Sequence, residues 1–196
     1  MKKILRKIIN IYYFIVNKIN FKINNIDVYT NIRSNIRGIL YIKNNGKCVI
    51  SKEVRINSRY SANPIGGQEF CTMIIGENGN IFIDEGAAIS NSTIVSNKEV
   101  YIGKNVFIGG DCKIYDTDFH SINLEDRIKE IDNNIKSKKV VIEDGAFIGT
   151  GSIILKGVKI GREAIIGAGS VVSKDIPSKQ IWGGNPAKFL KNIDDK

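Results

Sequence analysis

The sequence predicts an all-β solenoid, a triangular coil of short strands, and three observations lead to this fold class. From Ile142 onward aliphatic residues recur every six positions, at 142, 148, 154, 160, 166 and 172. Four positions after each stands a mostly small residue: Ala146, Ser152, Val158, Ala164, Ser170 and Ile176. Nineteen glycines against three prolines favour short strands and tight turns. A period of six fits neither a helix nor simple strand alternation, but it fits a coil with three flat sides.

Composition limits the class of protein. The chain has 196 residues, 42% of them hydrophobic and 25% charged, which is enough for one sizeable core and one main domain. Three cysteines, Cys48, Cys71 and Cys112, form no CxxC pair and leave one thiol over under any disulfide scheme. A reducing compartment is the simpler interpretation, so we expect the cytoplasm.

The formal net charge of +9 allows nucleic acid, an anionic membrane or an anionic small molecule as partner. The chain has no Lys/Arg-rich run interleaved with aromatic residues and no Cys/His arrangement typical of a zinc-binding nucleic-acid module. We therefore expect no nucleic-acid partner.

Residues 1–23 predict an amphipathic helix with six basic side chains and no acidic one. Aliphatic and aromatic residues fill one side of the helical wheel: Ile4, Leu5, Ile8, Ile9, Tyr12, Ile15, Val16 and Ile19. The uninterrupted apolar run is too short to span a bilayer, and no small-residue cleavage site follows it. Two interpretations stay open: a helix that caps the core or packs on a neighbouring subunit, or a helix that lies on an anionic membrane surface.

The six-residue frame also appears before Ile142. It is visible at Ile102, Ile108 and Ile114, and at Ile83, Ile89 and Val95, with a spacing of seven between Val95 and Ile102. Ile50 and Ile56 begin another coil, although residues 57–80 do not keep the period. Each coil can bury its inner face only against its neighbours, so several coils are needed for stability.

One interruption of the frame contains the only histidine. After Ile114 the next inward aliphatic residue would fall at position 120, but it falls at Ile142. This offset predicts that a loop at about 117–139, with His120 near its base, is extruded from the solenoid. Together these patterns divide the chain into a helix and linker (1–35), a solenoid (36–180) and a C-terminal tail (181–196).

The closing segment IGAGSVVSKDIPSKQIWGGNPAKFLK, together with the repeats, resembles the hexapeptide-repeat acyltransferases. It is most similar to the maltose and galactoside acetyltransferase branch and to polysaccharide O-acetyltransferases. The resemblance covers residues 75–191 well and the N-terminal third poorly. It implies a left-handed parallel β-helix, a handedness that the repeat pattern alone does not predict.

The resemblance also implies an enzyme that transfers an acetyl group directly from acetyl-coenzyme A to a sugar hydroxyl in surface polysaccharide or lipopolysaccharide biosynthesis. Removing the hydroxyl proton requires a base with a pKa near neutral, and His120 is the one histidine available. By similarity a backbone amide near Gly149 and Thr150 would stabilise the oxyanion. The family further implies a homotrimer with its sites between subunits.

Other site residues are also implied by the resemblance. Asn91 and Asp118 are candidate acceptor contacts, although Asn91 also fits a left-handed corner, and Asp116 and Asp118 could each orient His120 or cap a turn. For Asp116 and Asp118 the turn is the favoured interpretation. The candidate coenzyme A contacts, besides Gly149 and Thr150, are Ala168, Ser173, Lys174, Lys188 and Lys191.

Four alternatives were weighed. A zinc carbonic anhydrase site of this fold needs three histidines, so one histidine excludes it, and we expect no metal. A serine O-acetyltransferase would carry a longer helical N-terminal domain. A sugar-nucleotide N-acetyltransferase and a non-catalytic assembly subunit both stay open.

Overall fold

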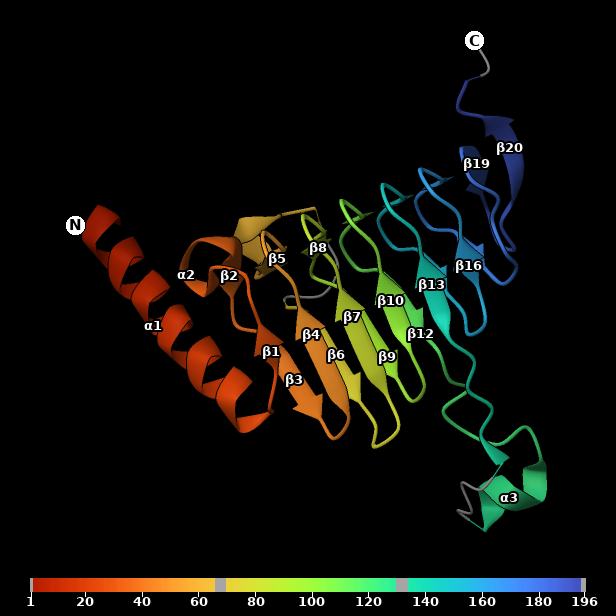
Figure 1. The fold of residues 1–196 in the computed structure, drawn as a ribbon, viewed down its shortest axis with the longest axis horizontal. Helices are drawn as coiled ribbons and strands as arrows, with labels where there is room; N and C mark the ends of the chain where they lie inside the picture. Colours follow the sequence, from red (N-terminus) through yellow and green to blue (C-terminus); the bar gives the residue numbers. More distant parts are fainter. Residues whose placement is uncertain (1, 66–69, 130–133, 195–196) are drawn as a thin grey trace.

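The computed structural model describes residues 2–65, 70–129 and 134–194, and in them the chain winds into a three-sided parallel β-helix. Figure 1 shows the coils stacked along one axis, with a helix at the N-terminal end and a small lobe projecting from one side. The predicted solenoid of six-residue repeats, with its N-terminal helix, is confirmed.

Each side of the β-helix is one sheet, and β1 to β19 pair in parallel. Sheet A contains β1 (Asp27–Val28), β4 (Lys47–Ile50), β7 (Asn80–Ile83), β10 (Val100–Ile102), β13 (Val140–Ile142) and β16 (Lys159–Ile160). Sheet B contains β2 (Ile36–Gly38), β5 (Arg55–Ser58), β8 (Ala88–Ser90), β11 (Phe107–Ile108), β14 (Phe147–Ile148), β17 (Ile165–Ile166), β19 (Gln180–Gly183) and β20 (Lys188–Asn192). Sheet C contains β3 (Tyr41–Asn44), β6 (Thr72–Ile75), β9 (Thr93–Ser96), β12 (Lys113–Tyr115), β15 (Ile153–Ile154) and β18 (Val171–Val172).

The core consists of three columns of buried aliphatic side chains, one for each sheet. Strand register places the repeat residues directly above one another, and they are almost completely buried. The columns are Ile50, Ile83, Ile102, Ile142 and Ile160; Ile56, Ile89, Ile108, Ile148 and Ile166; and Met73, Ile94, Ile114, Ile154 and Val172. A period of six therefore places one such residue from each side in the interior.

The structure corrects the frame at one corner. Ile94, and not Val95, pairs with Ile114 in the column of sheet C, while Val95 pairs with Tyr115. The step from Ile89 to Ile94 is five residues, and Asn91 within this shorter corner adopts a left-handed φ of 39°. The longer step from Ile94 to Ile102 restores the register.

Helix α1 (Lys2–Ile23) lies across the N-terminal end of the coils (Figure 1), and the side that faces them carries Asn17 and Asn20 together with Phe21, which is buried in the core. Asn17 Nδ2 donates to the Gly38 carbonyl (2.8 Å), Asn17 Oδ1 accepts from the Leu40 amide (3.1 Å), and Asn20 Nδ2 donates to the Leu40 carbonyl (2.8 Å). The first coil has no coil before it to pair with, so asparagines satisfy backbone groups that would otherwise lack partners. A short helix α2 (Ile32–Asn35) packs beside α1.

The apolar side of α1 points away from the coils. Its side chains are 42–73% exposed, and they are Ile4, Leu5, Ile8, Ile11, Tyr12, Ile15, Ile19 and Ile23. The helix does cap the core, but the apolar side that a cap would be expected to bury stays uncovered. No helix in the described ranges is both long enough and apolar enough to cross a bilayer.

The predicted loop after β12 is confirmed as a lobe. An antiparallel bridge between Thr117 and Ser137 closes its base, and within it lies α3 (Leu124–Ile128), with Asn123 as N-cap. Residues 130–133 of the loop lie outside the described residues. Figure 1 shows the lobe projecting away from the coils, and the ladder resumes at β13 in register with β10.

The ends of the β-helix differ from the proposed division at residues 36 and 180. Pairing already begins at Asp27, because β1 joins β4 in sheet A. It continues past residue 180, where β19 pairs with β17 and β20 folds back antiparallel on β19. A second interruption, at 59–71, contains the 3₁₀ helix η1 (Tyr60–Ala62) and explains why residues 57–80 lose the period.

Candidate functional site

His120 is exposed at the base of the lobe. Its amide donates to the Asp118 carbonyl (2.8 Å), and the preceding Phe119 has a left-handed φ of 65°. The Phe119 ring packs edge-on against Tyr115 in sheet C, with centroids 4.9 Å apart. The backbone at His120 is thus anchored to the β-helix while its imidazole remains open to solvent.

The two aspartates near His120 hold the lobe in place. The Asp116 carboxylate is fully buried and accepts from the amides of Asn97, Lys98 and Glu99 at 2.7–2.8 Å and from Ser96 Oγ at 2.8 Å. The prediction that it caps a turn is confirmed by these bonds. Asp118 forms an ion pair with Lys156, and its role as an acceptor contact stays a prediction.

Where sheet B turns into sheet C, the corners carry a row of free backbone amides, which we call the B–C edge. The amides of Gly110, Thr150 and Ala168 donate to no acceptor in the described ranges, and they lie on successive coils. Coils stack about 4.8 Å apart, so a ligand running along this edge could accept several hydrogen bonds.

Within this edge the structure favours Thr150 over Gly149 as an oxyanion donor. The Gly149 amide is already used, because it donates to the Ile166 carbonyl (2.8 Å). The Thr150 amide is free, and a Cβ at Gly109 would lie 2.7 Å from its nitrogen. Glycine at position 109 therefore keeps this amide uncovered.

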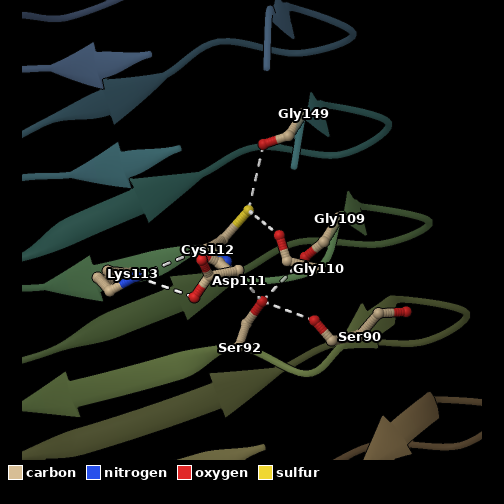
Figure 2. A network of polar contacts seen from close by, with 8 residues as sticks. All are labelled: Ser90, Ser92, Gly109, Gly110, Asp111, Cys112, Lys113 and Gly149. Atoms are coloured by element: carbon tan, nitrogen blue, oxygen red, sulfur yellow. Dashed lines mark hydrogen bonds and ion pairs between the residues drawn. The ribbon is translucent and has the colours of Figure 1, made fainter. Parts of the chain in front are cut away.

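The B–C edge is supported from inside by a network of polar contacts (Figure 2). Ser92 Oγ donates to the carbonyls of Ser90 (2.7 Å) or Gly109 (2.9 Å) and accepts from the Cys112 amide (3.0 Å). Cys112 Sγ donates to the Gly149 carbonyl (3.2 Å). Burial raises the pKa of this thiol, so Cys112 is a packing residue and a poor nucleophile.

Asn91 lies at the same edge, one coil before Gly110. Its side chain is fully buried, Nδ2 donates to the Asn63 carbonyl (3.4 Å), and Oδ1 has no hydrogen-bond partner. The left-handed backbone confirms the corner interpretation of Asn91. The unpaired Oδ1 leaves room for a second role, because a buried acceptor without a donor costs free energy.

A pocket of about 420 Å³ opens on sheet B beside this edge. Its lining includes Gly109 and Thr150 of the B–C edge, the polar residues Asn57, Asn63 and Ser90, and Arg37, Arg55, Phe107 and Phe147. The Arg55 guanidinium stacks over the Phe107 ring at 5.7 Å. Hydroxyl, amide, aromatic and arginine groups together can bind a polar ligand that carries a negative charge.

Arg37 and Arg55 were not singled out from the sequence, since the N-terminal third keeps the repeat poorly. The distribution of arginines along the sequence is a signal that could have identified Arg37 and Arg55. Five of the seven arginines fall within the first 59 residues, against two carboxylates, and four of these five form the pairs 33/37 and 55/59.

The remaining predicted contacts lie elsewhere. Ser173 and Lys174 are exposed at the opposite side of sheet C from Ala168, at the corner from which the lobe also leaves. Lys188 and Lys191 are exposed on β20. The width of sheet C thus separates His120, Ser173 and Lys174 from Asn91, Thr150 and Ala168 within one chain.

Metal ligands do not gather in the part of the chain that the structure describes. No three side chains of His, Cys, Asp or Glu converge there on a point that could hold an ion.

Comparison with known proteins points to one family. A family model described as "Bacterial transferase hexapeptide (six repeats)" matches residues 139–174, and "Hexapeptide repeat of succinyl-transferase" matches 99–135. A solved maltose O-acetyltransferase from Clostridium difficile 630 is 30% identical, with 72% of this chain and 68% of that chain covered and a TM-score of 0.58. A galactoside acetyltransferase solved with coenzyme A is 29% identical, with 72% and 65% covered and a TM-score of 0.57.

Curated relatives match over shorter segments. Gamma carbonic anhydrase 2 of Arabidopsis thaliana is 40% identical over 57 residues, which are 28% of this chain and 20% of that protein. A tetrahydropyridine-dicarboxylate N-acetyltransferase of Clostridium perfringens is 39% identical over 56 residues, 29% and 24% of the two chains. The chain thus covers only about a quarter or less of the length of these relatives.

Proposed function

The chain belongs to the hexapeptide-repeat acyltransferase family, and from this premise we propose that it transfers an acetyl group from acetyl-coenzyme A to a sugar hydroxyl. The observation that carries the proposal is that one chain holds both a solvent-open imidazole on its lobe and a row of free amides on the B–C edge. A base and an oxyanion donor are the two groups that direct acyl transfer requires.

The reaction needs one proton carrier. His120 takes the proton of the acceptor hydroxyl as its oxygen attacks the thioester carbonyl carbon. The Thr150 amide donates to the oxyanion of the tetrahedral intermediate. When the carbon–sulfur bond breaks, the imidazolium returns its proton to the departing thiolate, so no metal or covalent enzyme intermediate is needed.

The donor fits the B–C edge. Coenzyme A has a pantetheine arm with amide carbonyls, and the free amide of Ala168, one coil beyond Thr150, can donate to one of them. Its phosphates would lie near Lys188 and Lys191, which are exposed and form no ion pair in the described ranges. Lysine supplies a positive charge but not the paired hydrogen bonds of arginine, so the interaction of these lysines with the phosphates would be mainly electrostatic.

The two halves of the site come together in a homotrimer, where His120 of one chain faces the B–C edge of the next. Within one chain, sheet C separates these halves. The lobe also leaves Ile122, Leu124 and Ile128 60–73% exposed, and a neighbouring subunit would cover them.

The acceptor would occupy the pocket on sheet B, with its reacting hydroxyl toward Asn91 and Thr150. A sugar of surface polysaccharide or lipopolysaccharide biosynthesis suits the hydroxyl and amide groups there. A sugar-nucleotide amine is the second candidate, since the same base and oxyanion donor serve an amine and an N-acetyltransferase is among the relatives.

The chain would work in the cytoplasm, at the inner face of the membrane. The outward side of α1 presents eight exposed apolar residues, and Lys18 and Lys22 border this stripe. Since residues 1–26 contain no carboxylate, an anionic lipid surface matches both the apolar stripe and its charge.

The test of the proposed function is thioester consumption. With acetyl-coenzyme A and a panel of sugar acceptors, His120→Gln should lower the release of free coenzyme A by about 10²–10⁴-fold, because no other group can take the proton. Lys129→Gln, an exposed change in the same lobe, should keep wild-type rates. A folded His120→Gln protein that still turns over at the wild-type rate would refute the proposal, and mass shifts of the panel identify the acceptor.

A further inference from the structure

Beside the acceptor pocket lies a second cavity, of about 300 Å³, in which four arginines meet. Arg6 comes from α1, Arg33 from α2, Arg37 from β2 and Arg59 from the residue before η1. These elements are far apart in sequence, and only the packing of α1 and α2 on the first coil brings them together.

The cavity carries an uncompensated positive charge. None of its lining residues is acidic, and none of the four arginines forms an ion pair in the described ranges. Arg59 Nε is buried without a hydrogen-bond partner, and its guanidinium stacks over the Tyr13 ring at 5.4 Å. Like charges held close together raise the free energy of the folded state unless an anion offsets them.

From these observations we propose that Arg6, Arg33, Arg37 and Arg59 form a binding site for a diphosphate group. A single carboxylate would offset one of the four positive charges, whereas a diphosphate carries two or three negative charges. Its oxygens also match the paired N–H donors of guanidinium groups.

The position of the cavity assigns the diphosphate to the acceptor, an assignment that rests on the proposed function. The two pockets share Ser34 and Arg37 in their linings. A sugar in the first pocket, with its hydroxyl near Thr150, would therefore extend its diphosphate toward the four arginines. The carrier beyond the diphosphate is either a nucleoside or a lipid.

Direct binding tests the site without any activity. Inorganic pyrophosphate, titrated calorimetrically into the full chain, should bind the wild type, and Arg33→Gln/Arg37→Gln should weaken binding by about tenfold or more. Arg162→Gln, an exposed arginine near the far end of the β-helix, is the matched control and should bind as wild type does. Equal binding by all three proteins, or no binding by the wild type, overturns the proposal; Arg59→Gln repeats the test if the double variant unfolds.

Competition then identifies the source of the diphosphate. Displacement of pyrophosphate by a soluble nucleoside diphosphate sugar supports a nucleotide acceptor, and displacement only by vesicles bearing a diphosphate-linked lipid supports a lipid acceptor. If neither competitor displaces pyrophosphate, the assignment of the diphosphate to an acceptor is wrong. If the His120 test fails while pyrophosphate still binds, the proposed function falls and the anion site stands.

Discussion

The Asp116 carboxylate shows how one residue can serve the site without touching a substrate. It lies four positions before His120, yet its oxygens are occupied by three backbone amides and Ser96 Oγ. It fixes the corner at residues 97–99 and with it the starting point of the lobe. The backbone at His120 is thus anchored, and no carboxylate of the described residues is bonded to its imidazole.

Removing this carboxylate should destabilise the fold. Asp116→Ala leaves buried amides without an acceptor, so we expect a loss of about 3 kcal/mol in the free energy of unfolding, measured by urea denaturation at fixed protein concentration. Asp118→Ala removes only a partly exposed ion pair and should cost about 1 kcal/mol or less. Equal midpoints for wild type and Asp116→Ala would show that the four bonds contribute nothing measurable.

At the scale of the element, α1 has two sides with separate tasks. Asn17 and Asn20 close the end of the first coil, whereas the opposite side is exposed and packs on none of the described residues. A helix whose apolar side is needed for folding could not leave that side exposed, so the stripe points to a binding role.

The stripe can be tested by vesicle flotation. Ile8→Ser/Ile15→Ser/Ile19→Ser should reduce partition into phosphatidylglycerol vesicles by about a hundredfold, because three apolar side chains no longer enter the interface. Leu190→Ser/Ile193→Ser removes exposed apolar residues from the C-terminal end of the chain and should float as wild type does. If the α1 variant floats as wild type does, the stripe does not bind a membrane. If the variant instead loses its oligomeric state, the stripe is a contact between subunits.

The whole molecule is a stack of coils in which the two proposed halves of the site, His120 and the B–C edge, lie at opposite sides of sheet C. A trimer would close three sites at once, each made from two chains. In such an assembly the three α1 helices would lie at the same end of the trimer. All three could then bind one flat surface together, which would strengthen the binding of the trimer to that surface.

Mixed assemblies test this arrangement. His120→Ala and Asn91→Ala should each be nearly inactive alone, but trimers reassembled from equal amounts of both should recover about a quarter of wild-type activity, since that share of interfaces pairs two intact halves. Reassembly of each variant with itself is the control. Absence of any recovery in verified mixed trimers would place the whole site within one chain.

The sequence by itself determined the repeating architecture. Six-residue spacing of aliphatic residues is enough to predict three buried columns, because each coil repeats the same choice of one inward side chain per side. The same spacing located the lobe, and the single histidine within it marked the candidate base. At Val95 the prediction was wrong by one residue, since Ile94 and Val95 are both aliphatic and only the strand pairing shows which of them joins the column.

Only the tertiary structure decided which surfaces stay open and which groups meet. The exposed side of α1, the free amides of the B–C edge and the four-arginine cavity all depend on how α1 and successive coils pack. This packing brings together residues far apart in the sequence: Asn20 bonds to Leu40, 20 positions away, and Arg6 lines one cavity with Arg59, 53 positions away. The local pattern of hydrophobic residues predicts which side chains each segment buries. Which segments come into contact depends on how all the coils stack.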